Sequence, residues 1–351
     1  MKRNIYLILL LTFISIIFLS LSIGPFKISI IQIIEIILEK TSLLSDNYQV
    51  SFEPLHQSVL WDIRLPRILL GIIAGFALGS SGAILQGLFR NPLVDPGFIG
   101  VSSGAAVGAM IAIMFSSFFM FYFPKWIAVF ILPLMAGLGA FFSTMSVYKM
   151  SKISNKTNIM AMLLSGIAVN AFAGSIIGLF ISLSSDAELR SFTFWTLGGL
   201  DNANWKVVTL SSVVIFFLFI PMHSIRYQLD IFMLGDGEAY NLGLNVESLK
   251  KQVVLIASMM VGLSVAFCGM IGFVGLVTPH LVRFILGPKH KHLIPGSAIL
   301  GAILLVSSDL ISKIIIAPAQ LPIGVVTSAI GAPFFIWLIF NYKTRIGYSE
   351  Q

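Results

Sequence analysis

Charged residues and cysteine are both scarce in this sequence. Asp, Glu, Lys and Arg together make up 11% of the 351 residues, whereas 57% are hydrophobic. Soluble domains carry about 25% charged residues, so these few charges cannot cover the surface of a soluble globule of this length. The mean hydropathy of +0.96 agrees with that conclusion. The composition therefore excludes an ordinary soluble protein and indicates an integral membrane protein.

The single cysteine, Cys268, excludes an intrachain disulfide. It lies in the apolar run "LSVAFCGMIG", where we expect it to act as a small buried hydrophobic residue. Catalytic motifs are also missing, since there is no G-x-x-x-x-G-K-[ST], no H-E-x-x-H and no Ser/His/Asp grouping. His280 lies in an apolar segment without a second histidine at ligand spacing. We therefore expect a chain that is not an enzyme, with no catalytic residue, metal site or cofactor of its own.

Carboxylates are almost absent from the apolar runs, which argues against a proton-relay carrier. The net charge of +7 would suit a nucleic-acid partner. Basic cytoplasmic loops explain the same excess of lysine and arginine better in a membrane protein. We therefore expect lipid contact and no nucleic-acid partner.

Long apolar runs, broken by glycine, proline or charged residues, account for most of the chain. A helix needs about 20 residues to cross the hydrocarbon core, so a chain of this length has room for about ten helices. The first run is too long for the apolar part of a typical signal peptide, and we interpret it as a retained helix. The runs do not alternate as barrel strands would. We predict an all-α polytopic membrane protein with spans at residues 4–24, 66–88, 96–120, 126–148, 158–184, 205–223, 252–270, 274–287, 294–313 and 322–341.

Ten crossings place both termini on one side of the membrane. With the termini inside, 14 of the 22 Lys and Arg residues fall in inner segments and eight in outer segments. The positive-inside rule therefore favours an N-in, C-in orientation. We predict one transmembrane domain over residues 1–351. Its outer connection covers 25–63, with an amphipathic stretch at 30–39, and its longest inner connection covers 224–251.

The second predicted span carries a strip of small residues. Gly71, Gly75 and Gly79 are spaced by four, and Gly82 follows. Small residues at this spacing let another helix backbone approach closely. The strip therefore serves either packing within the bundle or a substrate route or subunit contact. Gln86, in the last turns of the same span, is more often an inter-helix hydrogen-bonding residue than a ligand.

Two pairs of charged residues lie near the outer ends of predicted spans. Arg64 and Arg67 are three residues apart, with Pro66 near the first helical turn, where proline is tolerated. The arginines either snorkel to the interface or meet an acidic partner. Asp309 and Lys313 are four residues apart, so a local ion pair is expected.

The inner connection contains the stretch "LGDGEAYNLGLNVESLKK". Asp236 and Glu238 suit the start of a short helix, and Gly243 suits its end. Asn245 then suits the cap of a second helix that runs into the seventh span. These helices form either a docking surface for a soluble partner or only a structured loop.

Several stretches in a fixed order resemble a known family. They include "RLPRILLGIIAGFALGSSGAILQGLFRNPLVDPGFIGVSSGAA", "LLSGIAVNA", "FWTLGGLDNANW", "GMIGFVGLVTPHLVRFILGP" and "LPIGVVTSAIGAPFFIWLI" as well as the inner stretch quoted above. From about residue 55 to 341 the chain resembles the FecCD-type permease subunits of type II ABC importers for iron-siderophores, haem and cobalamin.

The resemblance implies a ten-helix permease in the bacterial cytoplasmic (inner) membrane. It implies a homodimer, or a pair with a close paralogue, in which the second, fifth and tenth spans line the pathway. Two separate ATPase subunits would hold ATP and Mg²⁺, and a periplasmic or lipid-anchored binding protein would deliver the cargo. The cargo is expected to be iron-siderophore or haem, because that branch is large. A cobalamin permease of the same family, or an ion-coupled secondary transporter, is the alternative.

The resemblance also assigns roles to residues. Arg64 and Arg67 would receive carboxylates of the binding protein, and Lys313 stands where the family has a third arginine, so this contact should be looser. Gln320 replaces the usual glutamate of the following segment. The ATPase-coupling segment maps to Gly235, Asp236, Glu238, Ala239, Leu242 and Gly243.

Overall fold

The computed structural model describes residues 2–41, 51–317 and 319–347, and this part of the chain is almost entirely helical. In chain order its elements are α1 (Lys2–Ser22), α2 (Ile30–Lys40), α3 (Pro54–Ser58), the π-helical turn η1 (Val59–Arg64), α4 (Leu65–Leu88), the 3₁₀ turn η2 (Pro96–Ile99), α5 (Val101–Met114), α6 (Ser116–Tyr122), α7 (Lys125–Met150), β1 (Lys152–Ile153), β2 (Lys156–Thr157), α8 (Ile159–Leu183), α9 (Asp186–Leu197), α10 (Trp205–Phe232), α11 (Asp236–Asn241), α12 (Val246–Cys268), α13 (Val274–Leu286), α14 (His290–Ile314) and α15 (Ile323–Gly347).

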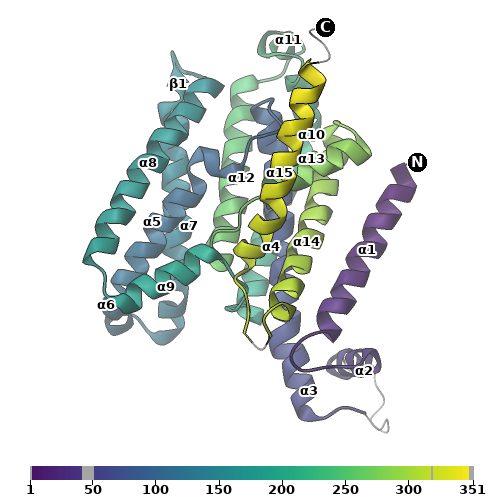
Figure 1. The fold of residues 1–351 in the computed structure, drawn as a ribbon. Helices are drawn as coiled ribbons and strands as arrows, with labels where there is room; N and C mark the ends of the chain where they lie inside the picture. Colours follow the sequence, from purple (N-terminus) through teal and green to yellow (C-terminus); the bar gives the residue numbers. More distant parts are fainter. Residues whose placement is uncertain (1, 42–50, 318, 348–351) are drawn as a thin grey trace.

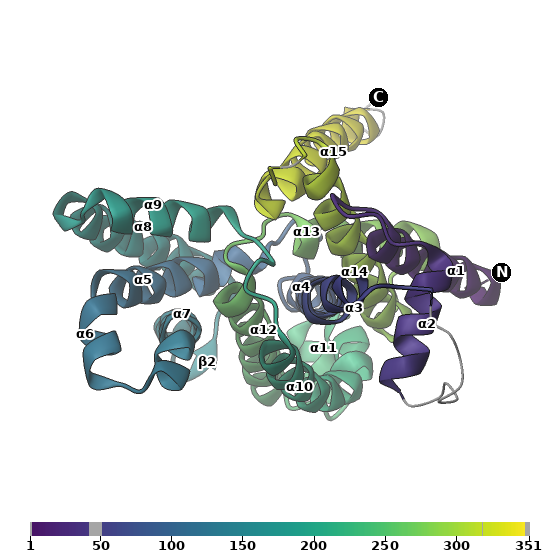
Figure 2. The ribbon, with the colours of Figure 1, turned by 90° about the horizontal axis from the view of Figure 1, so that it is seen from below.

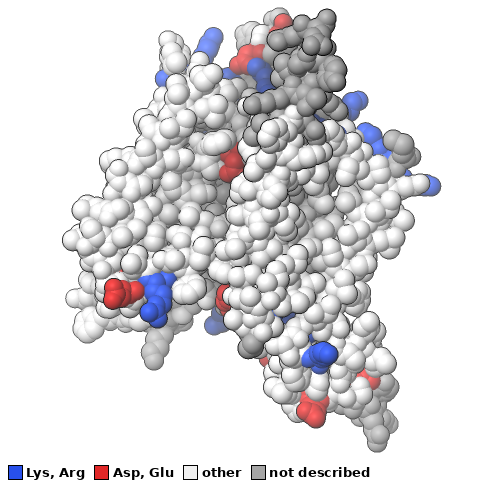
Figure 3. Space-filling view, in the orientation of Figure 1, with Lys and Arg blue, Asp and Glu red and all other residues white. Residues whose placement is uncertain are grey.

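The predicted class is confirmed. Within the described residues, seven helices are long and apolar enough to cross a membrane, and α5 with α6 forms one further apolar pair that bends by 65°. The shorter apolar helix α13 and the apolar stretch Ile323–Leu338 of α15 occupy the places of the eighth and tenth predicted spans. On the face shown in Figure 3, lysine, arginine and the carboxylates lie mainly near the two ends of the molecule, and most of the surface between them is uncharged. The number of crossings stays a prediction.

Three boundaries differ from the predicted ones. The second span starts earlier, because α3, η1 and α4 form one helix from residue 54 to 88. Pro66 has no N–H to bond the preceding turn. The wider turn before it, in which the Leu65 N–H bonds the Leu60 carbonyl, accommodates the ring. Arg64 and Arg67 therefore lie inside a continuous helix and not before its start.

The third span, predicted as one helix over 96–120, is divided. Pro96–Ile99 form a 3₁₀ turn, and Gly100 at φ +79° separates that turn from α5. A left-handed residue cannot continue a right-handed helix, so α5 begins only at Val101. The chain then turns at Phe115 into α6.

The sixth span is longer than predicted. The polar residues after 223 favoured a connection, yet α10 continues to Phe232. Met222, Ile225, Leu229 and Phe232 follow at helical spacing and are 0% exposed, so their burial sustains the helix. The connection is thus shortened to 233–245. The predicted second short helix is the first part of α12.

The outer connection contains α2 where the amphipathic stretch was predicted. A capping box joins Ser29 and Gln32 at its start. Ile33 and Ile36 are 0% exposed, whereas Ile31 on the opposite face is 67% exposed. The rest of the predicted connection includes residues 42–50, which lie outside the described residues.

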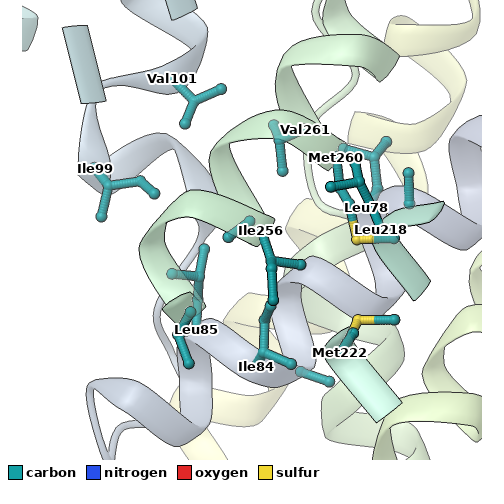
Figure 4. Packing of buried hydrophobic residues seen from close by; sticks show 14 of the residues in the cluster. Leu78, Ile84, Leu85, Ile99, Val101, Leu218, Met222, Ile256, Met260 and Val261 are labelled. Carbon is teal, nitrogen blue, oxygen red and sulfur yellow. The ribbon is translucent and has the colours of Figure 1, made fainter. Parts of the chain in front are cut away.

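Helix α4 is at the centre of the bundle, with α12, α13 and α14 around it (Figure 2). Its apolar window is 78% buried, against 17% for α8. Leu78, Ile84 and Leu85 of α4 pack with side chains of α10 and α12, including Met222 and Met260 (Figure 4). The second span is therefore a core helix in this chain.

The glycine strip of α4 faces other helices of the same chain. A Cβ on Gly75 would lie 2.3 Å from the Gly301 carbonyl oxygen, and one on Gly79 would lie 2.1 Å from that of Ser297. On Gly82 it would lie 1.8 Å from the Gly275 carbonyl oxygen. No side chain fits at these distances, so the geometry favours close packing of α4 on α13 and α14.

We expect Gly82→Leu to lower the midpoint of thermal unfolding strongly, because the added side chain must push α4 and α13 apart. Gly137→Leu on α7 is the matched control, since a Cβ there meets no atom within 4 Å. The measurement is thermal unfolding of the detergent-solubilised chain followed by size exclusion. Equal midpoints for the two variants would contradict the packing assignment.

Candidate functional site

Helix α11 projects from one end of the bundle, at the same end as the start of α1 and the end of α15 (Figure 1). Gly235 at φ +122° and Gly243 at φ +83° bound it, in conformations that glycine adopts without strain. Ala239 is fully buried against the bundle, whereas Tyr240 is 75% and Leu242 63% exposed. The helix therefore presents an apolar surface away from the bundle.

Asp236, the first residue of α11, joins this helix to α12 and to the turn that follows α4. Its Oδ1 accepts a hydrogen bond of 2.6 Å from Arg90 Nη2, and its Oδ2 accepts one of 2.8 Å from Lys250 Nζ. Burial raises the pKa of the Asp236 carboxyl, but the hydrogen bonds from Lys250 and Arg90 outweigh it and leave the pKa below its ordinary value. This stabilisation is present at neutral pH and is lost only as the pH falls through the lowered pKa.

Lys250 of α12 is the buried cation of this cluster, with 4% of its side chain exposed. Its ammonium group also donates to the Thr157 carbonyl at 2.9 Å and lies 3.5 Å from Glu247 Oε1. Glu247 in turn accepts from the Thr157 N–H at 2.9 Å and hydroxyl at 2.7 Å. An ammonium group has three N–H donors. Acceptors on α11, β2 and α12 lie within reach of them.

Arg90 follows the end of α4 in a left-handed conformation, at φ +49°. Its Nε and Nη2 donate to the Phe232 carbonyl at 3.1 and 2.7 Å. The guanidinium also lies 3.9 Å from the centroid of the Phe232 ring. Such a backbone conformation is uncommon for arginine, and these contacts hold it in place. A groove of about 1110 Å³ opens beside the cluster, lined by the β1–β2 hairpin, α11 and the start of α12.

A second charged cluster lies at the opposite end of the bundle. Arg67 Nε donates to Asp309 Oδ1 at 2.8 Å, and Arg67 Nη1 donates to Asp201 Oδ1 at 2.7 Å. Lys313 forms an ion pair with Asp309, as the spacing of four predicts. The Asp309 side chain is 1% exposed and that of Asp201 is 71% exposed. The arginine thus meets one buried and one accessible carboxylate, and both belong to this chain.

Arg64 forms no ion pair with a carboxylate of the described residues. Its guanidinium donates to the backbone carbonyls of Leu21, Ser22 and Phe26, and so ties α4 to the end of α1. Arg64, Arg67 and Lys313 are only 6%, 8% and 7% exposed. The three cations expected to receive a partner are therefore brought to one end of the bundle, but they are covered there by their own chain.

The remaining residues that the sequence singled out either contact neighbouring side chains and helices of the bundle or lie at its surface. Gln86 donates to the Leu276 carbonyl at 3.3 Å and accepts from Arg283 at 3.1 Å, so it joins α4 to α13. The His280 ring lies against Phe284. The described residues contain no group of three or more His, Cys, Asp or Glu arranged to hold a metal ion. Gln320 is exposed beyond α14.

Five residues of these clusters were not identified from the sequence: Arg90, Thr157, Asp201, Glu247 and Lys250. Most of their partners lie far along the chain: Arg90 and Asp236 are 146 positions apart, and Arg67 and Asp201 are 134 positions apart. The only local signal is the spacing of three between Glu247 and Lys250.

A bundle of apolar helices with a short helix projecting from one end and a buried charge cluster at the other defines a helical membrane protein. The chain belongs to the FecCD transport family, whose sequence model matches residues 9–341. The family resemblance is thus confirmed, and the chain is a multi-pass ABC transporter permease.

The similar curated proteins are named as permeases of different transport systems. The hemin transport system permease protein HmuU of Yersinia pestis is 40% identical over 82% of this chain and 84% of its own length. The cobalamin import system permease protein BtuC of Halobacterium salinarum is 36% identical over 82% and 75%. A solved structure described as an inward-facing conformation of a metal-chelate type ABC transporter has a TM-score of 0.82, at 29% identity over 97% and 99%.

Proposed function

We propose that this chain is the translocation subunit of an ATP-driven importer for iron-siderophore or haem. It takes its cargo from a separate binding protein and is coupled to two ATPase subunits, which bind the ATP. The observation that carries the proposal is α11, a glycine-bounded helix with exposed Tyr240 and Leu242 at one end of a FecCD-family bundle. An exposed apolar patch of this kind suits a protein interface.

The end that carries α11 is then the cytoplasmic end, and the chain is N-in and C-in in a bacterial inner membrane. The start of α1 and the end of α15 lie at this same end (Figure 1). The hairpin between α7 and α8 adds exposed Lys152 and Lys156 there, as the positive-inside rule requires.

A second copy of the chain, or a close paralogue, would complete the pathway. Helices α8 and α15 keep large apolar side chains exposed, among them Leu164 and Phe172 on α8 and Trp337 and Phe340 on α15. Both helices lie at the edge of the bundle in the view along its axis (Figure 2). We therefore place the pathway between these helices and their counterparts, and α4 behind them as a support.

The test of the function is uptake into proteoliposomes that contain this chain with its cognate ATPase and binding protein. We expect ATP-dependent accumulation of a ferric siderophore or haem. The HmuU relative favours haem, and accumulation of cobalamin instead would select the alternative that the BtuC relative suggests. Uptake that follows an ion gradient without the ATPase subunits would overturn the proposal in favour of a secondary transporter.

The charge cluster of Arg64, Arg67 and Lys313 is proposed as the docking site of the binding protein. Asp201 is the accessible partner of Arg67, so a carboxylate of the binding protein can take its place. We expect Arg67→Met to weaken binding of the cognate binding protein about tenfold or more, the scale on which loss of a hydrogen-bonded charge pair affects an interface. Arg190→Met, an exposed cation on α9 at the same end, is the control. Unchanged affinity in a detergent-solubilised Arg67→Met complex would contradict docking at this site.

A further inference from the structure

We propose that Asp236 is the positioning residue that transmits movement of α11 to α8. Its carboxylate, held between Arg90 and Lys250, joins α11 to the β1–β2 hairpin, which leads directly into α8. The inference rests on the proposed coupling function of α11 and assigns the contacts that carry it.

The first branch runs from Asp236 through Lys250 to Thr157. Lys250 donates to the Asp236 carboxylate at 2.8 Å and to the Thr157 carbonyl at 2.9 Å. Thr157 ends β2, and the next residue, Asn158, caps α8 by accepting a hydrogen bond from the Ala161 N–H at 2.9 Å. No flexible linker separates the ammonium group from the first turn of α8.

The second branch runs from Asp236 through Arg90. Arg90 donates to Asp236 Oδ1 at 2.6 Å and to the Phe232 carbonyl at 2.7 Å. Phe232 ends α10 and is fully buried. This branch therefore fixes α11 relative to the central helix α4 and to α10, whereas the Lys250 branch fixes it relative to α8 and α12.

Burial makes the connection stiff. Only 4% of the Lys250 side chain is exposed, whereas 47% of the Asp236 side chain is. Separating the two would leave the buried ammonium group with Glu247, at 3.5 Å, as its remaining carboxylate, and weakening the pairing of a buried charge is costly. A displacement of α11 is therefore accompanied by Lys250 and the hairpin. The left-handed backbone at Arg90 is the kind of local strain that persists where surrounding contacts impose it.

The hairpin is well placed to move with α8. In Figure 1 the hairpin and α11 both stand at the same end of the bundle, and both line the groove. Thr157 is attached to α12 by two hydrogen bonds to Glu247, of 2.9 and 2.7 Å. The exposed face of α8 is part of the proposed pathway, so rotation at its first turn changes the opening between the two subunits.

The experiment compares Asp236→Asn, Lys250→Met and the double variant in the reconstituted complex with its ATPase subunits. Each single variant should lower uptake at least tenfold while ATP hydrolysis stays within twofold of wild type. The double variant should be no worse than either single one, because the two residues form one connection. Lys250→Arg, which keeps the charge and the donors, should restore part of the uptake. Lys251→Met, an exposed cation next to Lys250 on α12, is the matched control.

Spin-label distances are also measured in a complex that keeps the contact between Asp236 and Lys250. Spin labels at Asn241 and Ser154 report on α11 and the hairpin tip, and a third label at Lys291 marks the start of α14. During the ATP cycle the distance between the labels at Asn241 and Ser154 should stay constant, whereas the distance between the labels at Ser154 and Lys291 should change.

If both single variants took up as much cargo per ATP as the wild type, the proposed connection from α11 through Asp236 and Lys250 to α8 would be overturned. A change in the Asn241–Ser154 distance during the ATP cycle would overturn it as well. In either case ATP-driven uptake by the wild-type complex would leave the proposed function standing. A wild-type complex without ATP-driven uptake would overturn the proposed function, and this inference with it.

Discussion

Asp309→Asn should destabilise the protein by about 3–5 kcal/mol, the cost of breaking a buried ion pair. The Asp309 side chain is 1% exposed and faces two cations, Arg67 and Lys313, whose side chains are 9% and 8% exposed. Without the carboxylate, the buried Lys313 would lose its ion-pair partner and Arg67 would keep only the exposed Asp201. The measurement is the free energy of unfolding of the solubilised chain, together with the amount of chain inserted in the membrane.

Asp201→Asn is the matched control, because it removes the other carboxylate from the same arginine. The Asp201 side chain is 71% exposed, and exposed ion pairs contribute only about 0–1 kcal/mol. The double variant Asp309→Asn, Lys313→Met should recover part of the stability, since it also removes the cation that pairs with Asp309, whereas Arg67 keeps Asp201. Equal losses in the free energy of unfolding for the two aspartate variants would show that burial does not determine how much the Asp309 ion pairs stabilise the protein.

A second large effect is expected on the apolar surface of α11. Tyr240→Glu with Leu242→Glu should reduce ATP-driven uptake more than tenfold and weaken assembly with the ATPase subunits. Both side chains are more than half exposed in the isolated chain, so the change places charge in an interface core, where charged residues are depleted. Uptake in proteoliposomes and co-purification of the ATPase subunits measure the two effects.

The stability of the isolated chain should stay unchanged in this variant, because neither side chain is buried in the bundle. Met233→Glu, 48% exposed just before α11, tests how far the interface extends. A complex that assembles and transports normally with both glutamates would remove α11 from the proposed ATPase contact.

Much of the fold could be predicted from local pattern alone. Apolar runs of about 20 residues identify membrane helices because each such run satisfies its own backbone hydrogen bonds. The start of α11 at Asp236 and its end before Gly243 follow from helix-terminal preferences that act within a few residues. The spacing of Gly75, Gly79 and Gly82 predicts a closely packed helix face, and GXXXG-type spacing needs no knowledge of the partner helix.

Local pattern was misleading where burial competes with polarity. Residues after 223 read as a polar connection, but one side of that stretch is fully buried, and α10 continues through it. The same holds before residue 66, where proline suggested a helix start and the structure has a π turn inside a longer helix.

The sequence by itself determined the class of protein, the family and the existence of charged residues at the ends of particular helices. Only the tertiary structure decided what those charges meet. Arg67 pairs with Asp309, 242 residues further along the chain, and Asp236 pairs with Arg90, 146 residues before it. Helix formation depends on neighbours a few residues apart, whereas ion pairs between helices depend on how the helices pack. The packing, which brings α4 against α14 and α11 beside α12, therefore determines the partner of each charge.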